Sequence, residues 1–466
     1  MRRGRSLGQA IGVVALLCAS VGASTASAQV DYEIMASLQF NFSNPGARSL
    51  AMAGALTGAG DDATGAWTNP GGLTNITRPE VGVEFRGFNF QTPFVQGGRF
   101  SGTVSNLGAD TISGVVTGIS DTSTHSLSFV SAVVPKSRFA FAFYRTEVAN
   151  FETDVTTDGV FYNDPNDGNS RAFPIDGSLK VKIANFGGSA AVRLTDQISA
   201  GVGVSYYKFE LDSANSRFDA FFDQAAPNRV SPGSFLGPAL RTDANRVSRE
   251  FINGDDSAVG VNVGASINPN DRFRIGASYR QGPKFDLEYH RENAGGTVIG
   301  LANCANASTT ACQSEFKVPD VVAFGVLVKP VTALNVTVDY RRVFYSQLID
   351  NMGLGFRVLV KGEAVQKEDY VLDDGNEIRA AGEYLFTNLP SPLSAIAIRG
   401  GVWRDPDHRI RYEGPFQTDS VLYQPGTSEM HYTGGAGIVF EKAQFDVGFD
   451  RSETVKTFSV SAVVRF

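Results

Sequence analysis

Between Glu80 and Phe466 the chain alternates apolar and polar residues, and this alternation restricts the possible folds more than any other feature of the sequence. In residues 334–341, for example, Leu, Val, Val and Tyr alternate with Asn, Thr, Asp and Arg. Because successive side chains of a strand point to opposite faces, a period of two predicts strands with one apolar and one polar face. We predict about 14 such strands, near residues 80–90, 124–134, 138–148, 177–194, 198–212, 246–267, 271–290, 316–329, 333–346, 376–388, 395–404, 429–441, 444–452 and 455–466.

The connections between these strands alternate in length. Short turns are predicted at 135–137, 195–197, 268–270, 330–332, 390–392 and 442–443. Long polar loops are predicted near 91–123, 149–176, 213–245, 291–315, 347–375 and 405–428. An even number of strands, with short turns at one end and long loops at the other, is typical of bacterial outer-membrane barrels. A soluble propeller would repeat a blade signature every 40 to 50 residues or so. We therefore expect an all-β fold, a transmembrane antiparallel β-barrel.

The first residues have the composition of a secretory signal peptide. Arg2, Arg3 and Arg5 precede an apolar segment at 11–19, and Ala-Ser-Ala at 26–28 forms a small-residue cleavage site. Removing residues 1–28, which contain three arginines and no acidic residue, changes the formal net charge from −7 to −10. This acidity argues against a nucleic-acid partner.

The rest of the chain has no linker, low-complexity tract or charge block. It also lacks an apolar run of about 18 residues, so the sequence offers no candidate transmembrane helix. We expect three parts: a signal peptide at 1–28, an N-terminal hatch at 29–79 and the barrel at 80–466. The last strand ends on Phe466 after alternating apolar residues, which resembles the signal that the barrel assembly machinery recognises in the outer membrane.

Residues 44–73 differ from everything that follows them. Two Asn-Pro-Gly sequences, at 44–46 and 69–71, enclose a run of small residues with few β-branched side chains. The segment 47–55 is rich in Ala, Leu and Met and lacks Pro, so it predicts a short helix, whose length Gly54 and Gly58 limit. A small helical element that precedes a closed barrel can pack inside it, and we expect this one to form a plug.

Together, this hatch and the predicted barrel resemble the FadL family (OmpP1/FadL/TodX) of outer-membrane transporters for long-chain fatty acids and other hydrophobic molecules. The resemblance covers the whole mature chain as architecture and about 30 residues as motif. The motif consists of residues 46–55, Asp61, Asp62 and Ala63, and the segment 67–73 with Asn69, Pro70 and Gly71. The usual Asn-Pro-Ala of the family is Asn-Pro-Gly here, so the tightness of that turn is expected to differ.

The resemblance implies passive transport without covalent chemistry and without a cofactor. A hydrophobic substrate, such as a long-chain fatty acid, would be captured by extracellular loops, enter the barrel and leave sideways through a gap in the wall. This route bypasses the polar lipopolysaccharide layer. The hatch would close the lumen to water, and its Asn-Pro turn would shift to connect the binding site with the gap.

Two segments are candidates for capture and lateral exit. The loop near 213–245 carries apolar side chains that a water-exposed loop has little other reason to carry, and the proposed capture groove consists of Phe218, Phe221, Phe222, Phe235 and Leu236. Packing of these side chains against the barrel rim is an equal alternative. In the strand 177–194 the apolar residues change parity, which predicts a bulge and a lateral opening at Asn185, Gly187 and Gly188. Ordinary barrel curvature is the alternative explanation for these glycines.

Arginines on the polar face of the strands are candidates for binding a fatty-acid carboxylate, because a guanidinium binds a carboxylate through two parallel hydrogen bonds. The candidates are Arg274, Arg341, Arg379 and Arg399. Acidic residues share that face, so a structural ion-pair network is the alternative, and the sequence singles out no one arginine. Cys304 and Cys312 lie in one long loop and predict a structural disulfide.

Other classes of function are less consistent with the sequence. An enzyme needs a positioned nucleophile and base, but the four histidines are scattered, and no phosphate loop, metal cluster or cofactor motif is present. A general porin for polar solutes would lack the plug. A barrel associated with secretion machinery, which holds or shuttles protein cargo, remains the main alternative, because some relatives with this hatch signature have that role.

Overall fold

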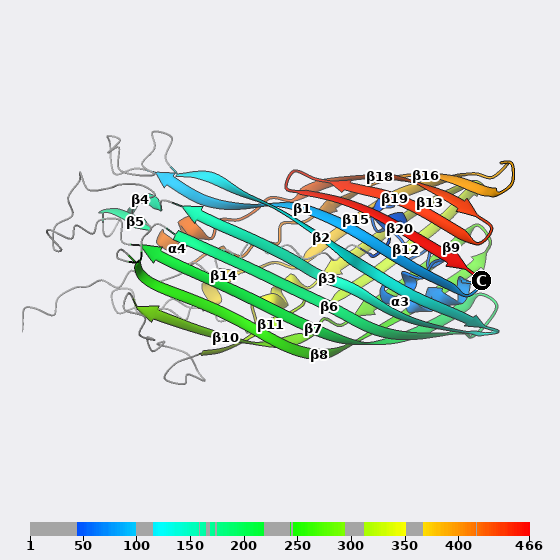
Figure 1. Ribbon diagram of the computed structural model, residues 1–466, viewed down its shortest axis with the longest axis horizontal. Helices are drawn as coiled ribbons and strands as arrows, with labels where there is room; N and C mark the ends of the chain where they lie inside the picture. The colour runs from blue at the N-terminus through cyan, green and yellow to red at the C-terminus, as the bar shows by residue number, and fades with distance from the viewer. Residues whose placement is uncertain are drawn as a thin grey trace, which may run out of the picture.

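The computed structural model describes residues 44–98, 115–157, 159–164, 168–172, 175–218, 243, 246–293, 312–350, 367–415 and 417–466. In it, 14 antiparallel strands close into a barrel (Figure 1), which confirms the predicted fold class. The strands are β1 (Glu80–Gly98), β2 (Val115–Lys136), β3 (Phe139–Thr157), β6 (Ile175–Arg193), β7 (Ile198–Phe218), β8 (Arg246–Asn270), β9 (Phe273–Arg280) continued by β10 (Lys284–Asn293), β11 (Cys312–Lys317) continued by β12 (Val321–Val331), β13 (Leu334–Val343), β15 (Gly375–Phe386), β16 (Leu393–Asp405), β18 (Glu429–Phe440), β19 (Ala443–Arg451) and β20 (Val455–Arg465).

The barrel closes between its first and last strands. β1 pairs with β20 in antiparallel register from Glu80↔Arg465 to Phe90↔Val455. Two predicted strands, 271–290 and 316–329, are each broken once, at 281–283 and 318–320. Each break contains a proline, which cannot donate a hydrogen bond to the ladder.

The long-loop end carries smaller elements. β4 (Val160–Asp164) and β5 (Gly168–Ala172) form a hairpin, and β14 (Tyr370–Val371) pairs with β17 (Arg411–Tyr412). Short helical turns are η4 (Tyr345–Leu348), η5 (Lys367–Asp369) and α4 (Gln417–Leu422). Among the described residues, no helix is long and apolar enough to cross a membrane.

The two faces of the barrel wall exchange character along its length. Toward the short turns the outward side chains are apolar and exposed, as for Phe143 (70%) and Phe458 (56%), whereas inward side chains such as Glu383 are polar and buried. Toward the long loops the order is reversed, because Phe209 is buried inside and Glu210 is exposed outside. The first half is therefore the membrane-facing band, and the second half continues above it with a polar exterior and an apolar interior.

The hatch lies inside the half of the barrel near the short turns, where it is drawn in blue in Figure 1. It comprises α2 (Ala47–Ala51), α3 (Gly65–Thr68) and η1 (Pro70–Asn75). The predicted helix at 47–55 is confirmed as α2 but ends early, because Ala53 and Gly54 adopt positive φ angles of 54° and 69°. α2 lies against β16 and β18 to β20, and η1 lies against β6 to β8. The hatch therefore reaches across the lumen.

Candidate functional site

Glycines on the inner wall let the hatch backbone rest directly on the strands. A Cβ atom on Gly276 would overlap the carbonyl of Thr57. A Cβ atom on Gly325 would overlap the backbone nitrogen of Gly58. The hatch backbone also lies against Gly201 and Gly448, and hatch side chains lie against Gly264, Gly401 and Gly435. Any larger residue at these positions would push the hatch away from the wall.

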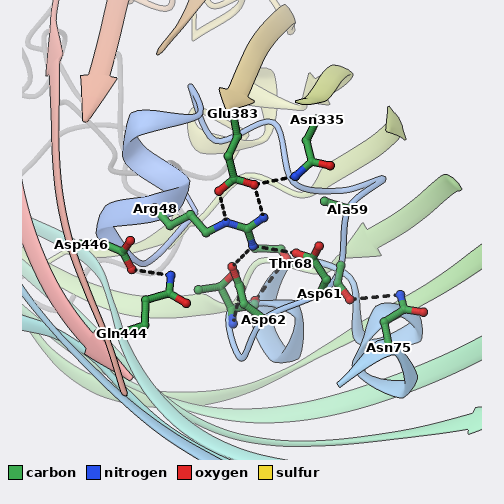
Figure 2. Close-up of polar contacts among 12 residues, drawn as sticks. Arg48, Ala59, Asp61, Asp62, Thr68, Asn75, Asn335, Glu383, Gln444 and Asp446 are labelled. Atoms are coloured by element: carbon green, nitrogen blue, oxygen red, sulfur yellow. Dashed lines mark hydrogen bonds and ion pairs between the residues drawn. The ribbon is translucent and has the colours of Figure 1, made fainter. Parts of the chain in front are cut away.

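Arg48 of α2 connects the hatch motif to the wall (Figure 2). Its Nη1 donates to Asp61 at 2.7 Å and to Asp62 at 3.0 Å, while Nε and Nη2 donate to the two oxygens of Glu383 at 3.0 and 3.1 Å. Asn335 donates to the same Glu383 carboxylate at 2.7 Å. The two predicted hatch carboxylates are therefore parts of one ion-pair cluster, which joins the hatch to β15.

The Asn-Pro-Gly turn is packed into the opposite wall. The side-chain amide of Asn69, which is fully buried, donates to the carbonyls of Thr57 at 2.9 Å and Ala265 at 3.1 Å. Pro70 and Gly71 lie against the backbones of Gly201 and Ala265. The turn thus joins two parts of the hatch to β8 through one side chain.

The predicted lumen arginines are occupied by the hatch or by carboxylates. Arg274, Arg341 and Arg379 donate to the hatch carbonyls of Ala59 (3.0 Å), Gly54 (2.5 Å) and Ala53 (2.8 Å), in that order. Arg379 also pairs with Glu377 at 2.7 Å, and Arg399 pairs with Glu383 at 2.8 Å and Asp446 at 2.7 Å. These contacts favour the structural network that the sequence left as the alternative.

Arg280 at the end of β9 differs from these arginines. Its guanidinium carbon lies 4.2 Å from the centroid of the Trp67 ring of the hatch. Within the described residues it makes no ion pair and no hydrogen bond. The Trp67 ring in turn lies 6.3 Å from the rings of both Tyr144 and Tyr207. Arg280 is therefore a buried cation inside the barrel, at the upper face of the hatch, that makes no direct contact with a carboxylate of the described residues.

Above the hatch the barrel interior is lined by buried apolar side chains, which we call the apolar lumen. Phe285 and Phe316 both stack on Phe209, with their ring centroids 4.5 and 5.2 Å from its centroid. On the other side Phe90 stacks on Phe151 at 4.5 Å. The residues of this region belong to one buried apolar cluster, which also includes Trp67. The Trp67–Arg280 contact therefore lies at the lower, polar end of this apolar region.

The wall is interrupted between β2 and β3. Ladder pairing between them runs only from Lys136↔Phe139 to Phe129↔Thr146, although both strands continue toward the long loops. Side chains bridge the remainder, where Ser126 donates to Glu147 at 2.6 Å and Thr153 donates to Ser120 at 3.3 Å. We call this interruption, between 115–128 and 147–157, the β2–β3 seam.

Both strands of the seam are bulged where it begins. The register of β1 against β2 shifts at Glu84/Phe85, and that of β3 against β6 shifts between Glu147 and Ala149. Each strand keeps its other neighbour, since β2 pairs with β1 up to Gly97 and β3 pairs with β6 up to Ile175. The Phe90–Phe151 stack lies inside, behind the seam. The interruption is therefore confined to the contact between β2 and β3, because each of these strands stays hydrogen-bonded to its other neighbour.

The predicted lateral opening in β6 lies one strand away from the seam. Asn185 pairs with Thr146 and Gly187 with Tyr144, at the level where β2–β3 pairing ends. β6 itself pairs with β7 without any register shift from Ile175 to Arg193. The parity change in its sequence instead marks the level where the apolar face moves from the outside to the inside of the barrel.

The remaining predicted site residues are only partly described. Phe218, at the end of β7, is buried, with 6% of its surface exposed. The rest of the predicted capture groove (Phe221, Phe222, Phe235 and Leu236) and Cys304 lie outside the described residues, as does the side chain of Cys312. The seam was not predicted from the sequence. The Ser and Thr residues within 120–126 could have indicated it, because they interrupt the apolar and polar alternation that marks the other strands.

The fold and the plugged lumen define a class: an outer-membrane β-barrel with an internal hatch. The family model described as outer membrane protein transport protein (OMPP1/FadL/TodX) matches residues 25–386. The chain therefore belongs to this family of outer-membrane transporters and channels for hydrophobic compounds, and it is a multi-pass barrel of the bacterial outer membrane.

Solved structures show the same fold at low sequence identity. A Pseudomonas aeruginosa FadL homologue is 15% identical, with a TM-score of 0.60 over 92% of this chain and 99% of its own. The P. putida toluene transporter TodX is 13% identical, with a TM-score of 0.53 over 91% of this chain and 99% of its own. The monoaromatic hydrocarbon channel CymD is 14% identical, with a TM-score of 0.50 over 92% and 99%. A search of curated proteins finds no match.

Proposed function

We propose that this protein carries long-chain fatty acids or similar hydrophobic carboxylates across the outer membrane by passive diffusion. The observation that supports this most directly is the apolar lumen, whose buried side chains extend down to the hatch ring Trp67 and to Arg280, a cation with no ion pair among the described residues. A water-filled porin would instead need a polar lumen above its constriction. The proposed passage involves no covalent step, so no residue is assigned a catalytic role.

The charge of Arg280 selects the substrate class. A guanidinium that is held in an apolar, partly buried site attracts an anion strongly, and a carboxylate can accept two of its hydrogen bonds. An uncharged hydrocarbon such as toluene, named for the relative TodX, has no carboxylate to accept these hydrogen bonds. The acyl chain would then extend upward among the stacked rings of Phe209, Phe285 and Phe316.

We place the lateral exit at the β2–β3 seam. Strand separation there breaks no ladder hydrogen bonds, because only side chains such as Ser126 and Glu147 bridge the two strands. The seam begins at the upper edge of the membrane-facing band, above the pair Phe129↔Thr146, which lies three residue pairs above the exposed Phe143. Rotation of the Phe90–Phe151 pair would connect the apolar lumen with this edge. Two predictions from the sequence stay untested: capture of the substrate by the 213–245 loop, and an alternative lateral opening at Asn185–Gly188.

Binding of oleate and of its methyl ester tests the proposal, because the two ligands share one chain and differ only in charge. We expect the purified protein to bind both, and Arg280→Gln to weaken oleate binding about tenfold, the loss expected for a charge-assisted hydrogen bond. Binding of the ester should not change. Lys208→Gln, which removes an exposed cation on the outer face of β7, is the matched control.

Two outcomes would contradict parts of the proposal. If Arg280→Gln leaves oleate binding unchanged while both ligands bind, the carboxylate class is wrong and the passage serves neutral molecules. If neither ligand binds to the folded barrel, hydrophobic transport itself is wrong, and a role as a partner of secretion machinery becomes the better interpretation.

A further inference from the structure

A groove of about 550 Å³ lies on the outer face of the barrel, where β1 meets β20. Its floor is Gly87, which has no side chain to fill the space between its cross-strand partners Phe458 and His125. The groove is therefore a gap in the outer side-chain surface, at the contact between the first and last strands of the barrel.

The residues around the groove form three horizontal rows, given by the strand register from β19 across β20 and β1 to β2. The lowest row is apolar and consists of Val447, Val460, Phe85 and Leu127. The middle row has Phe449, Phe458, Gly87 and His125, and the upper row has Arg451, Lys456, Asn89 and Ser123. Phe85 and Phe458 are each 56% exposed, so the groove opens toward lipid. The change from apolar to polar rows places its upper end at the membrane surface.

The upper row contains two cations side by side. Arg451 and Lys456 are direct cross-strand partners, and both are exposed on the outer face. Like charges opposite each other destabilise a strand pair. Within the described residues neither cation has an ion pair or a hydrogen bond. Lys456 is in the field of Asp121, whose carboxylate accepts hydrogen bonds from Asn89 at 2.6 Å and Gln91 at 3.2 Å. Tyr432, the partner of Arg451 on β18, is 61% exposed at the same level.

We propose that this groove binds a phosphate-bearing lipid of the outer leaflet, the lipid A portion of lipopolysaccharide. One acyl chain would lie over Gly87 between Phe458 and His125, and a phosphate would sit between Arg451 and Lys456. The charges match, because a doubly cationic rim above an apolar groove is complementary to an anionic head group on an acyl chain. The lipid would cover the contact between the first and last strands of the barrel. This site lies on the outer face of the wall and borders the β2 strand of the proposed exit seam, whereas the transport route runs inside the lumen.

Native mass spectrometry of the intact, detergent-solubilised barrel tests the proposal with three probes: bisphosphorylated lipid A, its dephosphorylated form and phosphatidylethanolamine. We expect one bisphosphorylated lipid A to stay bound, and the double variant Arg451→Gln/Lys456→Gln to weaken its binding about tenfold. The matched control is Lys180→Gln/Lys182→Gln, which removes two exposed cations from the outer face of β6. Heat-modifiable migration in electrophoresis shows that each variant is folded.

A second variant tests the acyl-chain part of the groove. Gly87→Leu should also weaken lipid A binding, because the new side chain fills the floor of the groove while both cations stay in place. The barrel can accept this change, since the Cβ would lie 2.9 Å from His125 Nδ1, a side-chain atom that can turn away. Equal binding of lipid A by the native chain and the double variant would overturn the proposal. Equal binding of phosphorylated and dephosphorylated lipid A would overturn it as well, since the groove would then be a nonspecific apolar surface.

Discussion

Arg48 is the residue on which the attachment of the hatch depends most. It is the only cation within hydrogen-bonding distance of Asp62 among the described residues, and it shares Glu383 with Arg399. The side chains of Arg48 and Glu383 are 13% and 3% exposed. A charge that is buried to this degree without a partner is costly, so the cluster is stable only as a whole.

We expect Arg48→Met to loosen the hatch by about 3–5 kcal/mol, the usual cost of removing one partner from a buried pair. Hydrogen–deuterium exchange of residues 47–75 would rise, and ion conductance of the barrel in planar bilayers would increase. Arg78→Met, at an exposed position after η1, is the matched control. Unchanged exchange and conductance in Arg48→Met would show that the cluster does not hold the hatch.

At the same scale, the hatch motif could be read from the sequence but the roles of the arginines could not. Asp61 and Asn69 contact the wall at Arg274 and Ala265, and Asp62 binds Arg48, which contacts Glu383. Arg274 and Arg280 are six residues apart on the same face of β9, yet one contacts a hatch carbonyl and the other only a ring. That difference depends on which part of the hatch lies opposite, and no local sequence signal contains this information.

At the scale of single elements, the wall glycines predict which strand positions tolerate a side chain. Gly276→Ala would place a Cβ against the Thr57 carbonyl, whereas the nearest atom to a Cβ on Gly382 is the Asn335 carbonyl at 3.9 Å. Overpacking of this kind costs about 1–3 kcal/mol. We expect Gly276→Ala to raise amide exchange in the hatch and Gly382→Ala to leave it unchanged. The same exchange in both variants would argue against close hatch docking at β9.

The segment after β16 should respond to pH. His408 stacks on Tyr345 with ring centroids 4.7 Å apart and contacts Asp405 at 3.4 Å. Burial lowers the pKa of His408, but the Asp405 carboxylate outweighs burial, so the pKa lies above its ordinary value. A raised folded-state pKa gives stability that is complete below the ordinary pKa of about 6.5 and is lost as the pH rises through the folded-state value.

We therefore expect amide exchange of residues 406–412, corrected for its intrinsic rate, to be more protected at about pH 6 than at about pH 9. His408→Asn should abolish this difference. A pH dependence that persists in His408→Asn would show that His408 is not the group that titrates.

Strands were easier to predict than the interruptions between them. Alternation locates the barrel strands because one face must meet lipid, and that constraint acts on every residue. The parity change at Asn185–Gly188 coincides with the level where the apolar side of β6 changes, and β6 keeps its ladder with β7 there, so the lateral opening at this position stays a prediction. The β2–β3 seam depends on pairing between strands, which the sequence of either strand does not specify.

At the scale of the whole molecule, the barrel has two stacked halves with opposite interiors. The half in the membrane band has a polar lumen, which the hatch fills and neutralises, and the half above it has an apolar lumen. Deleting residues 29–77 should therefore leave an inserted barrel with a water-filled lower lumen, because the freed arginines and carboxylates can be hydrated. Ion conductance in planar bilayers should rise and oleate binding should fall, since Trp67 is removed. A truncated barrel that stays closed to ions would contradict this division.

The central claim is that substrate leaves the lumen sideways through the β2–β3 seam, and a reversible cross-link tests it most directly. In a chain with both loop cysteines replaced by serine, Ser126→Cys/Glu147→Cys would join the strands at the foot of the seam, where the native side chains are 2.6 Å apart. Ser120→Cys/Thr153→Cys, at a native contact of 3.3 Å, would join the same strands higher up as a control. We expect oxidation of the lower pair to stop oleate uptake by cells, reduction to restore it, and the upper pair to leave most uptake intact. Full uptake with the lower cross-link formed would contradict lateral exit at this seam.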